Sequence, residues 1–140
     1  MRGTRTEMRR LIGLAVVLAL AFGVVTLIAL EGREVVVVET ADEHGAPRRT
    51  RTWIAEDAGV LWIEAANPER PFLVDLRRQP ELVLERGGAR FVCRGDPSSD
   101  ADGGHARIRG LLAARYGWAD RWIGLVADTR RSLAIRIACS

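Results

Sequence analysis

Residues 34–65 read EVVVVETADEHGAPRRTRTWIAEDAGVLWIEA, and this stretch decides the fold. β-branched and apolar residues gather in three runs, at 34–40, 49–54 and 60–65. Runs of this length and composition are typical of β-strands, and the Asp-, Gly- and Pro-containing segments between them are typical of turns. Because strands joined by short turns pair in opposite directions, the stretch predicts an antiparallel meander.

The chain downstream of the meander alternates between helical and strand patterns. A short helix is predicted at 72–79 between two prolines, and a longer helix at 105–116 that is interrupted or restarts near residue 118. Strands are predicted at 82–86 and 89–94 around a Gly-Gly hairpin turn, with a closing strand at 132–138. The sequence therefore predicts an α+β domain, mainly antiparallel β, with about six strands and two or three helices.

Upstream of the meander, residues 11–30 read LIGLAVVLALAFGVVTLIAL and carry no charge. Twenty helical residues at about 1.5 Å each span about 30 Å, the hydrocarbon thickness of a bilayer. A cleaved signal peptide is the alternative, but its apolar core usually has only about 7–15 residues. The sequence thus predicts a basic flank (1–10), a transmembrane helix in contact with the lipid bilayer (11–30) and a folded domain (31–140).

The charges indicate the side of the membrane on which the domain lies. Residues 1–30 carry four arginines and one glutamate, which account for the whole net charge of +3, while residues 31–140 carry 17 charges of each sign. The positive-inside rule then predicts a single pass through the inner (cytoplasmic) membrane, with the N-terminus cytoplasmic and the domain periplasmic or otherwise extracytoplasmic. A neutral domain argues against nucleic-acid binding.

All 21 Lys and Arg residues of the chain are arginine, which is typical of a GC-rich bacterial genome. The chain also has two cysteines, whose state the sequence leaves open. Cys93 and Cys139 could pair once in an oxidising compartment, or could be two partly buried thiols, the commoner arrangement for cysteine pairs of this kind.

Three segments, in this order along the chain, carry a resemblance to a known family. They are GAPRRT (45–50) before a tryptophan-containing strand, NPERPFLVDLRRQPELVLERGG (67–88) and RYGWADR (115–121). Together they resemble the deazaflavin (F420)-dependent nitroreductase and quinone reductase family, and in particular a membrane-anchored branch with one N-terminal hydrophobic helix. That family belongs to the FMN-binding split barrels related to pyridoxamine 5'-phosphate oxidase.

The resemblance implies a split β-barrel, commonly a homodimer, with a groove for F420 or FMN between the strands and the helix that begins near Pro71. In members of the family, basic and small polar residues hold the cofactor phosphate. The matching positions here, together with the aromatic residues that could line the pocket, are Arg48, Arg49, Thr50, Arg51, Trp53, Asn67, Arg70, Tyr116 and Trp118.

Each of these residues also has a purely structural interpretation. Arginine suits phosphate because its planar fork donates two hydrogen bonds at once, but arginines on a strand face could instead pair with Glu39 or Glu64 across the sheet. Trp53 could stack on a flavin-like ring or belong to the core, and Trp118 could pack in the core, line the pocket or lie at the membrane interface. His44 and His105 form no recognisable triad or metal site.

Two functions remain open at this stage. The first is a reductase that acts on quinone or nitro compounds with a flavin or deazaflavin, and a membrane tether suits a lipid-soluble quinone. The second is a non-catalytic accessory subunit, with no cofactor, that stabilises a larger respiratory or photosynthetic complex through other integral membrane subunits. The neutral domain, the outward topology and the acidic Asp75, where the family has asparagine, favour the second, because reduced deazaflavin is a cytoplasmic cofactor. Haem or lipid in the same groove is a third alternative.

Overall fold

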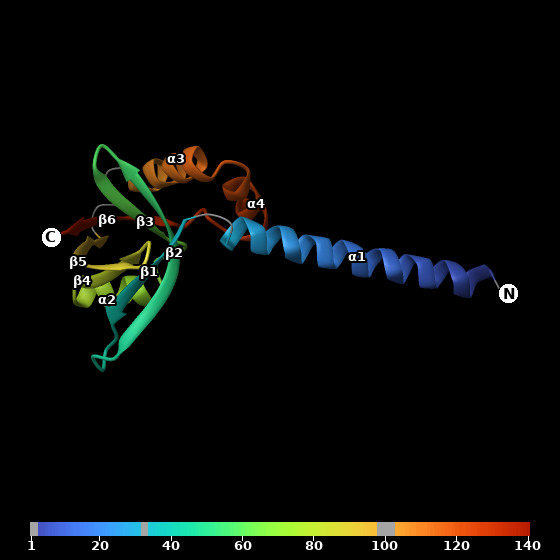
Figure 1. Ribbon diagram of the computed structural model, residues 1–140, viewed down its shortest axis with the longest axis horizontal. Coiled ribbons are helices and arrows are strands. Elements are labelled where there is room, and N and C mark those ends of the chain that lie inside the picture. The colour runs from blue at the N-terminus through green and yellow to red at the C-terminus, as the bar shows by residue number, and fades with distance from the viewer. Residues whose placement is uncertain (1–2, 32–33, 98–102) are drawn as a thin grey trace.

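The computed structural model describes residues 3–31, 34–97 and 103–140, and it forms one barrel with a long helix projecting from it (Figure 1). The elements are α1 (Gly3–Glu31), β1 (Val35–Ala41), β2 (Pro47–Asp57), β3 (Val60–Ala65), α2 (Pro71–Arg78), β4 (Glu81–Arg86), β5 (Ala89–Asp96), α3 (Gly104–Tyr116), α4 (Trp118–Val126) and β6 (Leu133–Cys139). The strands close a barrel in the order β1-β2-β3-β6-β5-β4, with every neighbouring pair antiparallel. The α+β prediction and its antiparallel split barrel are confirmed.

The barrel interior follows from the period-two pattern of the strands. In β1, Val36, Val38 and Thr40 are buried while the residues between them are partly exposed. α2 closes the barrel with one apolar face, on which Phe72, Leu73 and Leu76 are each at most 2% exposed. Pro71 occupies the first turn of α2, where its missing N–H costs nothing. α2 packs so closely on β5 that a Cβ at Gly95 would lie 3.0 Å from Leu76.

A second core lies outside the barrel, where α3 covers the outer faces of β2, β3 and β6, and α4 packs between α3 and the end of α1 (Figure 1). Trp62, Ile108, Leu112 and Tyr116 are buried there. Ala29, near the end of α1, is also fully buried in this cluster. The long helix is therefore packed into the domain at its C-terminal end and is not attached by its backbone alone.

Helix α1 is continuous from the basic flank through the apolar segment. Its stretch Arg5–Leu30 is long and apolar enough to cross a membrane, which makes it a candidate span by length and composition. Most of its large apolar side chains are exposed, as expected of a helix surrounded by lipid. At the domain end, the Trp122 Nε1–H of α4 donates to Thr26 Oγ1 at 3.0 Å, and the Trp122 ring lies 5.2 Å from Phe22.

The two cysteines form a disulfide between β5 and β6. Cys93 and Cys139 are directly opposite each other in the antiparallel register of these strands. The sequence allowed either a disulfide or two partly buried thiols, and the structure contains the disulfide. The sequence could not decide between them because the register of two strands 46 residues apart is set by the whole barrel.

We predict that Cys139→Ser lowers the free energy of unfolding by about 2–4 kcal/mol, because the bridge restricts the unfolded chain. Cys139 is the suitable position because it is exposed, whereas Cys93 is buried. The measurement is urea unfolding with and without reductant. The reductant should shift the wild type to the midpoint of the variant and leave the variant unchanged; equal midpoints for the oxidised wild type and the variant would contradict the prediction.

Candidate functional site

A groove of about 400 Å³ lies where the barrel meets the helices. It forms beside the point where β2 changes its partner: β2 pairs with β1 from Pro47 to Trp53, and with β3 only from Ile54 onward. Just beyond that point, the Thr52 hydroxyl donates to the Glu64 carbonyl oxygen at 3.3 Å. The start of α2, the middle of α3, the end of α4 and the last apolar residue of α1 complete the walls.

Four of the nine site residues predicted from the sequence line this groove: Thr50, Arg51, Trp53 and Arg70. Arg51 and Arg70 are exposed and come from different elements, β2 and the residue before α2. Arg70 makes no ion pair with the residues that the structure describes. Two cations that reach one groove from separate elements are a suitable arrangement for holding an anionic group.

Arg109 is a third cation in the groove, and the sequence interpretation missed it. Arg109 donates to both Glu64 oxygens, at 3.0 and 3.2 Å, and to Asp120 Oδ1 at 2.6 Å. Burial alone would lower the pKa of Arg109, but the two carboxylates outweigh it and the pKa is raised. Arg109 therefore bridges Glu64 and Asp120, and it balances the charge of one of these two carboxylates. The sequence did not indicate this role for Arg109, because its contacts with Glu64 and Asp120 depend on how α3 packs on the barrel.

Trp53 forms the aromatic wall of the groove, and Tyr116 packs against it on the side away from the groove. Trp53 lines the groove and stacks on the Tyr116 ring, with centroids 4.5 Å apart and planes 17° apart. Tyr116 is 2% exposed and does not reach the groove. Its hydroxyl lies 2.8 Å from the Ile54 carbonyl oxygen, 3.0 Å from that of Glu34 and 3.2 Å from the Ile54 nitrogen, whose N–H it accepts. Tyr116 thus supports Trp53 from behind the groove wall, and its own contact with a cofactor stays a prediction.

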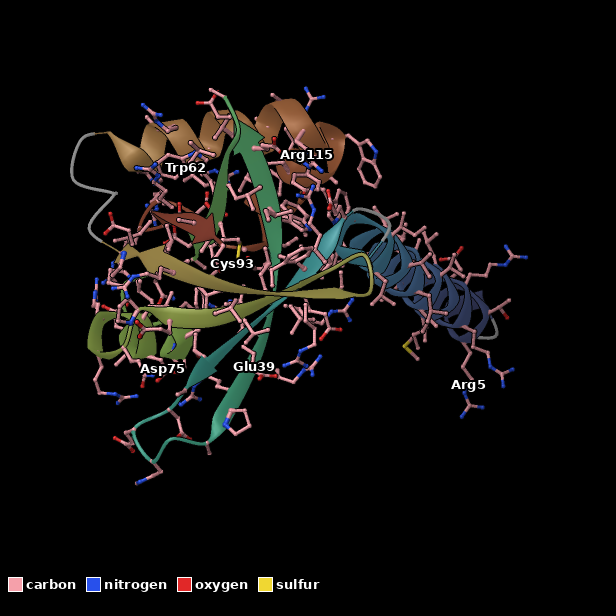
Figure 2. The ribbon with its side chains drawn as sticks, turned by 60° about the vertical axis from the view of Figure 1, so that its left-hand side comes forward. Arg5, Glu39, Trp62, Asp75, Cys93 and Arg115 are labelled. Carbon is pink, nitrogen blue, oxygen red and sulfur yellow. A yellow bond between two sulfur atoms is a disulfide. The ribbon has the colours of Figure 1, made fainter. Side chains whose placement is uncertain are left out.

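The remaining predicted cations lie outside the groove. Arg48 donates from Nε to the buried carboxylate of Asp75 at 2.8 Å, and Thr40 and Arg78 donate to the same carboxylate. Arg49 pairs with Glu85 at 2.9 Å and with Glu39 at 3.7 Å. Pairing with Glu39 across the sheet is one of the structural alternatives that the sequence offered for these arginines. Asp75 and Glu39 lie on the side of the barrel away from α3 and Trp62 (Figure 2). A cofactor role for Arg48 and Arg49 stays a prediction.

Asn67 and Trp118 are also not part of the groove lining. The Asn67 side-chain oxygen accepts the Glu69 N–H at 3.1 Å and so shapes the turn before α2. Trp118 is 43% exposed on α4. Among the residues described, His105 Nδ1 lies 2.9 Å from the Ser132 carbonyl oxygen, and no group of His, Cys, Asp and Glu side chains could hold a metal ion.

Comparison with known proteins shows the fold. No family model matches the sequence, and no curated protein matches it. Similar solved structures include a candidate 5-nitroimidazole antibiotic resistance protein from Bacteroides thetaiotaomicron (11% identity, TM-score 0.58, covering 81% of this chain and 76% of that one) and an F420 reductase (16%, 0.53, 81% and 92%). A third is a protein of the pyridoxinephosphate oxidase family from Clostridium acetobutylicum, related to general stress protein 26 of B. subtilis (16%, 0.56, 79% and 78%). At these identities the likeness shows the split-barrel fold and no particular activity.

We predict that Tyr116 ionises only above its ordinary pKa of about 10, because burial disfavours the tyrosinate. Tyr116 is the only tyrosine of the chain, so the tyrosinate absorbance of the whole protein reports on it alone. The raised pKa means that the stabilisation from Tyr116 is full below pH of about 10 and is lost as the pH rises through the folded-state value.

The control is the same titration in concentrated urea, where Tyr116 should titrate at the ordinary value. In Tyr116→Phe the free energy of unfolding should be about 1–3 kcal/mol lower at neutral pH, because the backbone partners at Ile54 and Glu34 lose the hydroxyl. Identical titration curves for the folded and unfolded protein would show that the hydroxyl is not held as described.

Proposed function

We propose that the protein is a membrane-anchored split-barrel reductase that binds FMN or deazaflavin F420 in the groove and acts on a quinone or a nitro compound. The observation that carries the proposal is that Thr50, Arg51, Trp53 and Arg70 meet in one groove although β2 and the start of α2 are far apart in the sequence. Thr50, Arg51 and Arg70 match positions that hold the cofactor phosphate in the family that the sequence resembles.

The residues of the groove fit a flavin-type cofactor in kind. Arg51 and Arg70 can hold a phosphate, the Thr50 hydroxyl can donate to it, and Trp53 offers a ring edge or face that Tyr116 keeps in place. Phe72 and Ile123 add apolar surface that excludes water. The volume of about 400 Å³ is within the usual range of ligand pockets, about 300–1,000 Å³. A flavin-type cofactor, when bound, supplies the hydride chemistry.

The position of the groove supports a lipid-soluble acceptor such as a quinone. Leu30, the last residue of the apolar run, is part of the groove wall. The groove therefore opens where the candidate span ends, close to the surface at which a quinone head group is found. For a nitro compound, the support is the structural likeness to the candidate nitroimidazole resistance protein.

The disulfide supports an extracytoplasmic position for the barrel. Disulfides persist in oxidising compartments and are rare in the cytosol, so the Cys93–Cys139 bridge agrees with the side predicted from the arginine-rich flank. On that side FMN is the better candidate of the two cofactors, because reduced deazaflavin is cytoplasmic.

A second candidate function is that of a non-catalytic accessory subunit of a larger membrane complex. Its support is that the chain's own carboxylates occupy Arg48 and Arg49, two cations that the family resemblance assigns to the phosphate. The exposed apolar surface of α1 would then contact other integral membrane subunits, or a second copy of this chain.

Purification from native membranes in mild detergent separates the two functions. The reductase proposal expects a flavin or deazaflavin absorption spectrum that belongs to this chain. A stoichiometric integral-membrane partner, with no chromophore on this chain and no binding of added FMN or F420, would favour the accessory subunit and overturn the reductase.

We predict that the double variant Arg51→Ala/Arg70→Ala weakens FMN binding by at least tenfold, because charge-assisted hydrogen bonds to phosphate each contribute about 1.5–3 kcal/mol. The matched control is Arg49→Ala, a neighbouring exposed arginine of β2 whose side chain points to Glu85 and Glu39. FMN binding is measured by titration of its fluorescence, and F420 is tested in parallel. Equal affinity in the wild type and the double variant would remove the groove as the cofactor site.

A further inference from the structure

Helix α4 presents an apolar face that the described part of the chain leaves largely uncovered. Trp118, Trp122 and Leu125 are spaced i, i+4 and i+7, so they share one side of the helix. Trp122, in the middle, contacts α1, whereas Trp118 is 43% exposed and Leu125 81% exposed. Val126, next to Leu125, is 44% exposed. The face thus continues on both sides of the contact with α1.

The contacts of Trp122 give the depth of α4 relative to the candidate span. Its partners Thr26 and Phe22 precede Leu30, the end of the apolar run, by four and eight residues. At the helical rise these distances are about 6 Å and about 12 Å along the axis of α1. α4 therefore lies beside the last two turns of the apolar segment and not beyond its end, an arrangement that Figure 1 also shows.

From this depth we infer that α4 is a second membrane contact of the protein, embedded in the lipid interface of the leaflet nearest the barrel. The inference rests on α1 crossing the bilayer. Lipid is the occupant, because a helix that lies at the depth of the hydrocarbon boundary is surrounded by lipid on every side that the protein does not cover. Interfacial helices bury their apolar face by about 5–10 Å, which agrees with the depth at Thr26.

The side chains of α4 fit this environment. Indole rings concentrate at membrane–water interfaces, and α4 has two of them. Arg121 is exposed on the same helix and can reach lipid phosphate groups, as basic residues near a membrane surface do. The one carboxylate of α4, Asp120, is buried and bonded to Arg109, so α4 exposes no acidic side chain to lipid.

The test uses spin labels on the full-length protein in nanodiscs of phosphatidylcholine and phosphatidylglycerol. A single cysteine replaces Leu125 or Val126 on α4. Both native cysteines are bonded to each other, so the spin label reacts with the introduced thiol. The matched control is Val74→Cys on α2, a helical valine with 47% exposure against 44% for Val126. Val24→Cys on α1 is the reference for lipid.

The measured quantity is the accessibility of each label to oxygen, which dissolves in lipid, relative to a water-soluble nickel complex. We expect this ratio at Leu125 and Val126 to be several-fold higher than at Val74 and to approach that at Val24. Aqueous labels at Leu125 and Val126 beside a lipid-exposed label at Val24 would overturn the inference. An aqueous label at Val24 would overturn it through its premise.

A label at Val126 that is shielded from both reagents would show that a protein, or a second copy of this chain, covers α4 in place of lipid, and would equally overturn the inference. The readout requires no cofactor and no substrate. Its failure therefore leaves the reductase proposal in place, and failure of cofactor binding leaves the membrane contact in place.

Discussion

The hydroxyl of Tyr116 is the contact on which the arrangement of barrel, helices and groove depends. It joins the C-terminal end of α3 to the backbone of Ile54, where β2 begins to pair with β3, and to the backbone of Glu34, where the chain passes from α1 into the barrel. Its ring supports Trp53. One buried side chain thus contacts the second core, the segment that follows α1 and the aromatic wall of the groove.

Many arginines of the barrel domain form ion pairs with the chain's own carboxylates. Glu34 takes hydrogen bonds from Arg86 and Arg115, and the hydrogen bond from Arg86 is the main reason that the pKa of Glu34 is lowered. Asp75 is shared by Arg48 and Arg78, and Glu64 is taken by Arg109. A domain with equal numbers of each sign can satisfy most of its cations internally. These pairings separate Arg48, which is bonded to Asp75, from Arg70, which makes no ion pair with the described residues, although the family resemblance groups the two arginines.

The strands and the order of elements could be predicted from the sequence because they depend on local patterns. Val60–Ala65 was placed without error, since a six-residue apolar run between two turn segments is too short for most helices. Glycines 87 and 88 both adopt positive φ, which is why the Gly-Gly pair was a reliable hairpin signal. The groove was only half predictable. Its β2 residues belong to the family pattern, but Arg109, Ile123 and Leu30 reach it through the packing of three helices, for which the sequence holds no local signal.

The same packing connects the membrane to the chemistry proposed for the groove. A single tether would leave the barrel free to turn about α1, so the groove would face the membrane only part of the time. Trp122 and Ala29 remove that freedom within the protein, because they fix α4 and the second core against the last turns of α1. Ile123 and Ala127, next to the exposed Leu125 and Val126, are themselves part of the groove wall. Immersing α4 in lipid would therefore fix the opening of the groove at the interface, which is the depth at which the head group of a membrane quinone is exposed. A water-soluble substrate would gain nothing from this geometry, and for that reason the position of α4 favours a lipid-soluble substrate more strongly than the tether alone does.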